Sequence, residues 1–295
     1  MKREVAVALG GGGARGLAHI GALSELERAG YGIGALAGTS IGGVIASFYA
    51  AGLSPAKIAE WAEGAWGGGL FRLRPSSGGL LGIDRIRELL ERALAAKTFK
   101  DVRCPLALTA VDLEAGSEIV LTEGRLVEAV LATIALPGIF PPRAWGETRL
   151  VDGGVIDPVP VRPVRSLHNG PVVAVVLSAQ PGAPPGPSAL EIMPAYGVIS
   201  HLRVGQALQV FGRSLEISSR LFTDLRLQLD RPEVVVRPKL DSIGILDTPE
   251  PAPVIEEGRS AMAESLPELE RWFGVRGRIR RWGRSFAVAS PDDPS

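Results

Sequence analysis

Ser40 lies in a sequence setting that favours covalent chemistry. It is the central residue of Gly38-Thr39-Ser40-Ile41-Gly42, a GxSxG pattern between an apolar run over residues 33–37 and a helix-like run over residues 44–51. On a sharp strand-to-helix turn, the flanking glycines leave room for a strained backbone that displays a serine hydroxyl at a helix N-terminus. The pattern predicts a nucleophilic serine, and its alternative is a glycine-rich turn whose serine only caps a helix.

A second glycine-rich stretch, GGGGARG over residues 10–16, follows an apolar run near the start of the chain. Such a loop before a helix aims unpaired N–H groups at one point and so suits an anion. Gly11, Gly13 and Gly16 also fit the GxGxxG pattern of a dinucleotide site, but that site needs an acidic residue about 20 positions further on. Because residues 38–40 are Gly, Thr and Ser, we expect Gly11, Gly12 and Gly13 to bind an oxyanion.

Asp152 is the candidate base. It ends a short apolar run and is followed by Gly153 and Gly154. A carboxylate in this position is displayed at the carboxyl edge of a parallel sheet, where sites of α/β proteins form. The alternative is an Asp-Gly turn without chemistry.

The three histidines compete with Asp152 for the role of base. We expect His19, on the helix after the glycine loop, to be structural, and His168 and His201 to be solvated. A Ser-Asp-His triad in the order Ser40, Asp152, then His168 or His201, as in an α/β-hydrolase-type esterase, stays open.

Taken together, GGGARG at 11–16, GTSIG at 38–42 and DGG at 152–154 resemble the motifs of the patatin-like phospholipase family. Residues 112–116, 136–142 and 150–154 support the resemblance, which covers most of residues 4–265. It implies a three-layer α/β/α fold with a largely parallel central sheet and a Ser40–Asp152 dyad, without metal or cofactor. The supporting motif residues are Arg15, Gly16, Gly38, Gly42, Gly153 and Gly154. Thr133 and Asp157 depart from the family pattern, since we expect serine and asparagine there.

The resemblance implies hydrolysis of a carboxylic ester in a phospholipid, lysophospholipid or other acyl lipid. A free aspartate has a pKa of about 3.9, so either burial must raise the pKa of Asp152 or the helix must make Ser40 more acidic. Two other classes stay open: a nucleotide-binding dehydrogenase, and a lipid-binding module without turnover.

The elements that must position these residues alternate along the chain. Expected strands cover residues 4–9, 33–37, 105–113, 118–121, 149–151, 171–178 and 234–237. Expected helices cover residues 17–29, 55–66, 84–94, 123–135, 190–221 and 254–272. Strands alternating with helices predict an α/β fold around a largely parallel sheet.

The composition indicates one hydrolase domain over residues 1–270 and a C-terminal segment over residues 271–295. The 295 residues are 46% hydrophobic, with 32 basic and 32 acidic side chains, so bulk attraction to nucleic acid is not expected. Cys104 is the single cysteine. No leader pattern opens the chain, and the uncharged residues 29–56 are too rich in glycine for a membrane helix, so we expect a cytoplasmic protein.

Two surface expectations concern lipid. Trp61, Trp66, Leu70, Phe71 and the loop 180–187 are expected around the mouth of an acyl pocket, unless the aromatic side chains pack in the core. Residues 271–284 carry six arginines and no acidic residue. They are either a basic-aromatic patch for an anionic membrane surface, or a tail that is solvated or packs back on the domain. Oligomeric state is left open.

Overall fold

A computed structural model describes residues 3–67, 83–178, 203–245 and 247–274. The strands are β1 (Arg3–Leu9), β2 (Tyr31–Thr39), β3 (Leu106–Asp112), β4 (Ser117–Leu121), β5 (Arg143–Trp145), β6 (Thr148–Asp152), β7 (Val172–Val175) and β8 (Val234–Val236). The helices are α1 (Ala18–Arg28), α2 (Ile41–Ala50), α3 (Pro55–Gly67), α4 (Ile83–Leu94), α5 (Leu126–Thr133), α6 (Val161–Leu167), α8 (Arg203–Asp230) and α9 (Pro251–Phe273). Two 3₁₀ turns, η1 (Gly13–Leu17) and η2 (Gly153–Val155), complete the described elements.

The strands form one mostly parallel sheet, as the alternation of elements predicts. Its order is β5-β6-β3-β2-β1-β7-β8, and β4 pairs with β3. β2, β1, β7 and β8 are parallel neighbours, and β3 is parallel to β2, whereas β4, β5 and β6 make antiparallel pairs. The strands expected at residues 105–113 and 118–121 are confirmed, and they pair as the β3–β4 hairpin.

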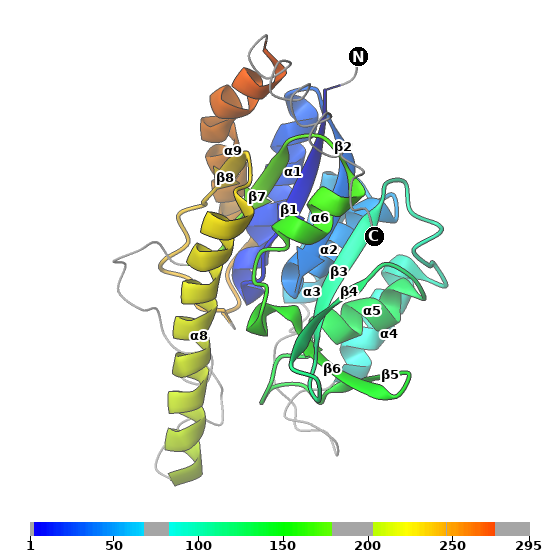
Figure 1. Ribbon diagram of the computed structural model, residues 1–295, viewed down its shortest axis with the longest axis vertical. Helices are drawn as coiled ribbons and strands as arrows, with labels where there is room; N and C mark the ends of the chain where they lie inside the picture. Colours follow the sequence, from blue (N-terminus) through cyan, green and yellow to red (C-terminus); the bar gives the residue numbers. More distant parts are fainter. Residues whose placement is uncertain (1–2, 68–82, 179–202, 246, 275–295) are drawn as a thin grey trace, which may run out of the picture.

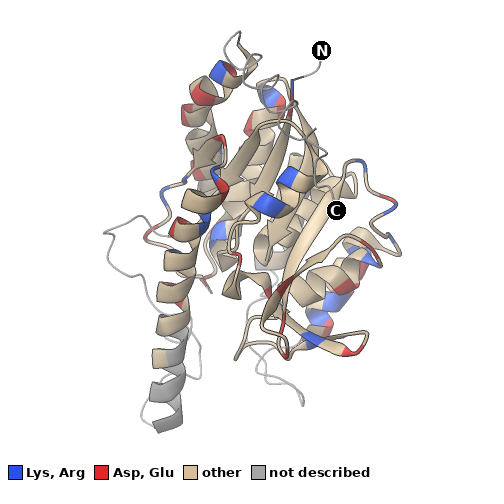
Figure 2. Ribbon diagram, in the orientation of Figure 1, with Lys and Arg blue, Asp and Glu red and all other residues tan. Residues whose placement is uncertain are grey.

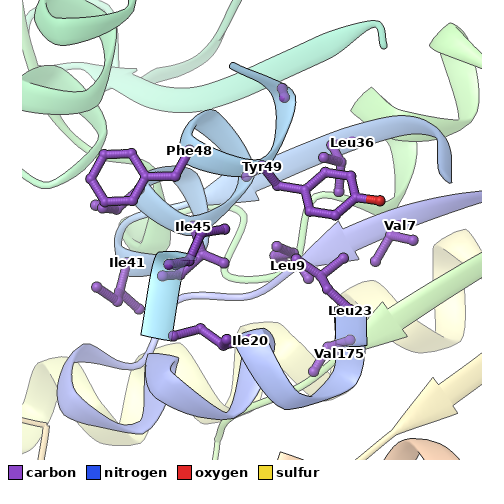
Figure 3. Packing of buried hydrophobic residues seen from close by; sticks show 14 of the residues in the cluster. Val7, Leu9, Ile20, Leu23, Leu36, Ile41, Ile45, Phe48, Tyr49 and Val175 are labelled. Carbon is purple, nitrogen blue, oxygen red and sulfur yellow. The ribbon is translucent and has the colours of Figure 1, made fainter. Parts of the chain in front are cut away.

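Helices cover both faces of this sheet (Figure 1). Larger side chains of β1, such as Val7 and Leu9, pack in the main core with α1 and α2. Figure 3 shows Ile20 and Leu23 of α1 meeting these strand residues from one side. The alternate β1 residues Ala6 and Ala8 belong to a second core on the opposite face, under α6. The fold is therefore the expected α/β/α arrangement.

Small residues line the face of the sheet under α6. Ala6 pairs with Ala35, and Ala8 lies between Ala37 and Ala174 in the sheet. Because alanine projects only a methyl group, α6 approaches the strands closely, and its residues Val161 and Val164 are buried there. This packing holds the chain that connects Asp152 to α6 against the strand ends.

Two expected helix boundaries differ from the structure. α8 ends at Asp230, nine positions after the predicted end at residue 221, and residues 190–202 lie outside the described residues. The helix expected at residues 84–94 begins one residue earlier, at Ile83, so Asp84 lies in the first turn of α4. Ser54 does cap α3, since its Oγ accepts the N–H of Lys57 at 3.3 Å.

Charged side chains of both signs lie on the outer helices and loops, whereas the central strands are largely uncharged (Figure 2). Cys104 is buried, as its apolar setting predicts. Among the described helices, none combines the length and apolar character needed to span a bilayer.

Candidate active site

Ser40 occupies the sharp turn between β2 and α2. Its backbone has φ 55° and ψ −126°, the left-handed side of conformational space that non-glycine residues rarely adopt. The flanking glycines permit this turn: a Cβ on Gly38 would overlap the backbone of Gly43, and one on Gly42 would overlap the carbonyl of Leu9. The strand-turn-helix context expected of the GxSxG pattern is therefore present.

Asp152 reaches Ser40 because β2 and β6 use successive parts of β3. Thr39, the last residue of β2, pairs with Thr109 of β3, and the next β3 residue, Ala110, pairs with Asp152. The ends of β2 and β6 thus meet. The Oγ of Ser40 donates a hydrogen bond to Oδ2 of Asp152 at 2.5 Å.

The Asp152 carboxylate is buried and oriented. Asp152 is only 2% exposed, and its Oδ1 accepts the N–H of Gly154 at 2.8 Å. Burial raises the pKa of Asp152 to about 6, although the hydrogen bonds from Ser40 and Gly154 act in the opposite direction. At neutral pH the group is mostly ionised yet more basic than a solvated aspartate, as a general base requires.

Thr133, one of the two departures from the family pattern, lies directly at the site. Its Oγ1 accepts the main-chain N–H of Ser40 at 2.9 Å, and the residue is fully buried at the end of α5. A serine would supply the same oxygen, so threonine preserves this contact.

The glycine loop lies beside Ser40, but Gly11 differs from the expectation. Its main-chain N–H donates to the carbonyl oxygen of Pro158 at 2.9 Å and is therefore committed to another partner. The next residues, Gly12 and Gly13, remain as candidate donors. Gly13 has φ 57°, and a Cβ there would overlap the carbonyl of Ile245, so this position requires glycine.

Arg15 holds the glycine loop in place. Its Nε donates to the carbonyl of Ile243 at 2.6 Å, and its Nη1 donates to that of Leu177 at 3.3 Å. Burial lowers the pKa of Arg15, and the acidic residues Glu216, Asp241 and Asp247 oppose this shift. Both hydrogen bonds are structural contacts that join the loop to the chain around residues 177 and 243. Gly16 leaves space for Ile41, which a Cβ would displace.

The two described histidines do not contact Ser40. His19 is fully buried, its Nε2 donates to the carbonyl of Gly10 at 2.7 Å, and burial lowers its pKa to about 4, so it is neutral at pH 7. His168 is at the opposite end of the parallel strands, where its Nε2 lies 3.8 Å from Glu4 at the start of β1. His201 lies outside the described residues.

Of the side chains expected around an acyl pocket, the structure describes Trp61. Its partly buried ring packs edge-on against Phe48 of the main core, with centroids 4.5 Å apart. The alternative interpretation, core packing, therefore holds for Trp61. The side chain of Trp66, together with Leu70, Phe71 and residues 180–187, lies outside the described parts.

Some contacts at the site had no signal in the sequence. Thr39 Oγ1 lies 2.7 Å from Thr109 Oγ1 and donates to the carbonyl oxygen of Asp157 at 2.9 Å. These residues come from three distant segments, and the motifs do not predict that they meet. Across residues 3–67, 83–178, 203–245 and 247–274, no three His, Cys, Asp or Glu side chains gather as a metal site would require.

Comparison with known proteins gives consistent results. The model of a family described as Patatin-like phospholipase matches residues 7–165. An uncharacterized NTE family protein of Mycobacterium tuberculosis is 34% identical over 184 residues, which are 61% of this chain and 51% of that protein. A second one is 28% identical over 283 residues, or 91% of this chain and 48% of that protein. The chain thus spans about half the length of these relatives.

A solved structure agrees on the fold. The crystal structure of VipD from Legionella pneumophila superposes with a TM-score of 0.53 at 13% identity, covering 92% of this chain and 67% of that one. At this identity the likeness concerns the fold alone.

Proposed function

The chain belongs to the patatin-like phospholipase family, and from this premise we propose that it hydrolyses acyl esters of lipids with Ser40 as nucleophile and Asp152 as base. The family supports lipid hydrolase activity in general. The observation that carries the finer proposal is the 2.5 Å hydrogen bond from Ser40 Oγ to Asp152 Oδ2 at a strained strand-to-helix turn. The substrate is a phospholipid, a lysophospholipid or another acyl lipid.

In the proposed reaction, Asp152 accepts the Ser40 proton while Oγ attacks the ester carbonyl carbon. The N–H groups of Gly12 and Gly13 hold the resulting oxyanion, next to the positive end of the α2 dipole. Collapse breaks the ester bond, the alcohol leaves with the proton from Asp152, and the acyl group stays on Ser40. Water, deprotonated by Asp152, then attacks this ester; the fatty acid leaves, and Asp152 returns the proton to Ser40 Oγ.

Burial supports Asp152 as the base. Of the two routes considered from the sequence, a raised Asp152 pKa or a more acidic serine, the first has a visible cause, since desolvation raises the Asp152 pKa to about 6. The histidine-dependent alternative finds no support from His19 or His168, because neither contacts Ser40. A lipid-binding module without turnover would not need the strained φ of 55° at Ser40.

An apolar face of α8 supports contact with a lipid surface. Six of the eight large apolar side chains exposed on the described residues lie on this helix, each between 40% and 66% exposed: Val210, Ile217, Leu221, Phe222, Leu225 and Leu229. Most follow a spacing of four, which places them on one side of the helix. α8 also packs against η2, directly after Asp152, so part of this helix lies near the candidate active site.

Two charged side chains in the C-terminal half of α8 form ion pairs with other parts of the protein. Asp224 pairs with Arg237, and Arg226 is directed toward Glu118 and Asp157 in the body of the protein. The apolar face is therefore suited to a bilayer surface, on which a peripheral, cytoplasmic enzyme would find its substrate. The C-terminal segment, residues 271–284, is a second proposed contact. Its first residues belong to α9, which ends at Phe273, and the ring centroids of Phe273 and Tyr31 are 5.5 Å apart. The residues after 274 lie outside the described parts.

A labelling experiment and a lipid screen test the proposal. A fluorophosphonate probe should react with the wild-type protein and with Ser47→Ala, but not with Ser40→Ala. Ser47 is a matched control because it is a buried serine of α2 whose hydroxyl has no hydrogen-bond partner among the described residues. Absence of labelling, or of fatty-acid release from every phospholipid and lysophospholipid class, would contradict the function.

A further inference from the structure

The dipeptide Asp157-Pro158 connects two parts of the candidate active site. The carbonyl oxygen of Asp157 accepts a hydrogen bond from Thr39 Oγ1 at 2.9 Å, and that of Pro158 accepts the N–H of Gly11, also at 2.9 Å. Thr39 directly precedes Ser40, and Gly11 belongs to the glycine loop. The placement of this dipeptide therefore helps to set the spacing between the serine and the loop.

The Asp157 side chain points away into a buried group of charges. It is fully buried, and neither of its carboxylate oxygens accepts a hydrogen bond from a donor group among the described residues. Arg226 of α8 lies between two acids, with Nε 3.8 Å from Asp157 Oδ1 and Nη2 3.4 Å from Glu118 Oε2 of β4. The Glu118 carboxylate contacts the same guanidinium, and its Oε1 likewise has no hydrogen-bond partner among the described residues.

One proton would satisfy this arrangement. Two ionised carboxylates beside one guanidinium leave an uncompensated buried negative charge, and neither acid can donate to the other. A shared proton makes the trio neutral and supplies the missing hydrogen bond. Burial and the charge of Glu118 raise the pKa of Asp157 to about 8, while Arg226 acts in the opposite direction.

Asp230 of α8 is a further charged group that acts on Asp157. It adds a smaller repulsion in the same direction as Glu118. Its side chain is almost fully buried, and Arg162 of α6 approaches its Oδ1 at 3.6 Å. Part of its charge is balanced by Arg162, and Glu118 has the larger influence on the pKa of Asp157.

We propose that Asp157 is a positioning residue whose carboxyl group shares one proton with Glu118 against Arg226, and thereby keeps the Asp157 and Pro158 carbonyls aligned with Thr39 and Gly11. The inference rests on the proposed function for its activity readout. Loss of the shared proton sets the fully buried Asp157 carboxylate against the partly buried Glu118 carboxylate and loosens the glycine loop. Since that loop acts on the oxyanion, kcat falls more than KM rises.

The test is the pH dependence of kcat on a soluble short-chain ester between pH 5 and 10. The wild type should lose activity with an apparent pKa near 8, whereas Asp157→Asn and Glu118→Gln should each lack this alkaline limb, because a carboxamide donates its hydrogen bond at every pH. Asp157→Ala should lose at least tenfold in kcat at neutral pH. Asp112→Asn is the matched control: this acid on β3 caps the β3–β4 turn through its Oδ1, and its variant should keep the limb.

Persistence of the alkaline limb in both carboxamide variants would overturn the inference. It would also be overturned if Asp157→Asn lowered kcat by the same factor at every pH. If the wild type hydrolyses no ester, the proposed function fails and thermal stability decides the inference. The folded protein holds a proton that the unfolded chain has released, so Tm should fall as pH rises from 6 to 8. A slope unchanged in Asp157→Asn would then contradict the shared proton.

Discussion

The hydroxyl of Ser40 and the carboxylate of Asp152 are joined by a 2.5 Å hydrogen bond across 112 positions of the chain. Burial of the carboxylate and strain at the serine occur at the same contact. This combination is typical of functional sites, because each feature costs stability and persists only where the surrounding structure maintains it.

Ser40→Ala and Asp152→Asn should each reduce ester hydrolysis by roughly a thousandfold or more, the scale seen when a member of a nucleophile–base unit is removed. Asparagine keeps the oxygen that accepts the Gly154 N–H but cannot take up the serine proton. Steady-state kinetics and circular dichroism on both variants are the measurements. A native fold with near-wild-type turnover in either variant would exclude the dyad.

The pH dependence of the wild type should show an acid limb with an apparent pKa near 6, since Asp152 must be ionised to accept the proton. The free energy of unfolding should change with pH in the opposite direction to activity. The raised pKa means that the folded state keeps a proton the unfolded state has lost, so stability declines as pH rises from about 4 to 6, by on the order of 3 kcal/mol. Denaturant titrations should find this slope reduced in Asp152→Asn.

Gly13→Ala and Gly11→Ala form a matched pair in the glycine loop. An added Cβ at Gly13 overlaps the Ile245 carbonyl and has an unfavourable φ, so the first variant should lose at least about 1 kcal/mol of stability and most activity. At Gly11 the nearest heavy atom would be 3.5 Å away, an ordinary contact, so Tm should change little. Equal Tm values for the two variants would refute the assignment of Gly13 as an obligatory glycine.

His168→Ala should retain wild-type kcat, because this side chain lies near Glu4 at the far end of the strands. His19→Ala should lower Tm, since it removes a buried ring and the hydrogen bond to Gly10. His201→Ala is also expected to retain activity. A thousandfold loss of kcat in the His168 or His201 variant, on the scale of a broken triad, would establish a histidine base instead.

The apolar face of α8 should bind vesicles in a manner that salt does not abolish, because no charge contact is involved. Leu221→Ser with Leu225→Ser should weaken co-sedimentation with zwitterionic phosphatidylcholine vesicles while leaving turnover of a soluble ester intact. Leu113→Ser is the control, since Leu113 is similarly exposed, at 47%, but lies outside α8. Unchanged sedimentation of the double variant would eliminate this surface.

Truncation after Gly274 tests the arginine-rich segment separately. The cut preserves Phe273, which packs near Tyr31, and removes the following residues. If that segment is an electrostatic anchor, the full chain should bind anionic vesicles more strongly than the truncated one, and high salt should remove the difference. Equal binding of the full and truncated chains to anionic vesicles at low salt would show that the segment is not an electrostatic anchor.

The sequence by itself determined the local features of this protein. The strand-turn-helix at Ser40, the Ser54 cap and the β3–β4 hairpin each depend on residues only a few positions apart. Glycine, serine and apolar periodicity specify such features because sterics and short-range hydrogen bonds act within one turn of chain. The motif order indicated the family, and the family model agrees.

The tertiary structure alone decided how the site is assembled. Asp152 meets Ser40 because β2 and β6 pair with adjoining parts of β3. Gly11 is removed from the candidate oxyanion donors by the carbonyl of Pro158, and Asp157 is placed beside Glu118 and Arg226 by the packing of α8. Pairing register and burial are long-range properties: they depend on which distant segments exclude water from one another, and no short stretch of sequence encodes that.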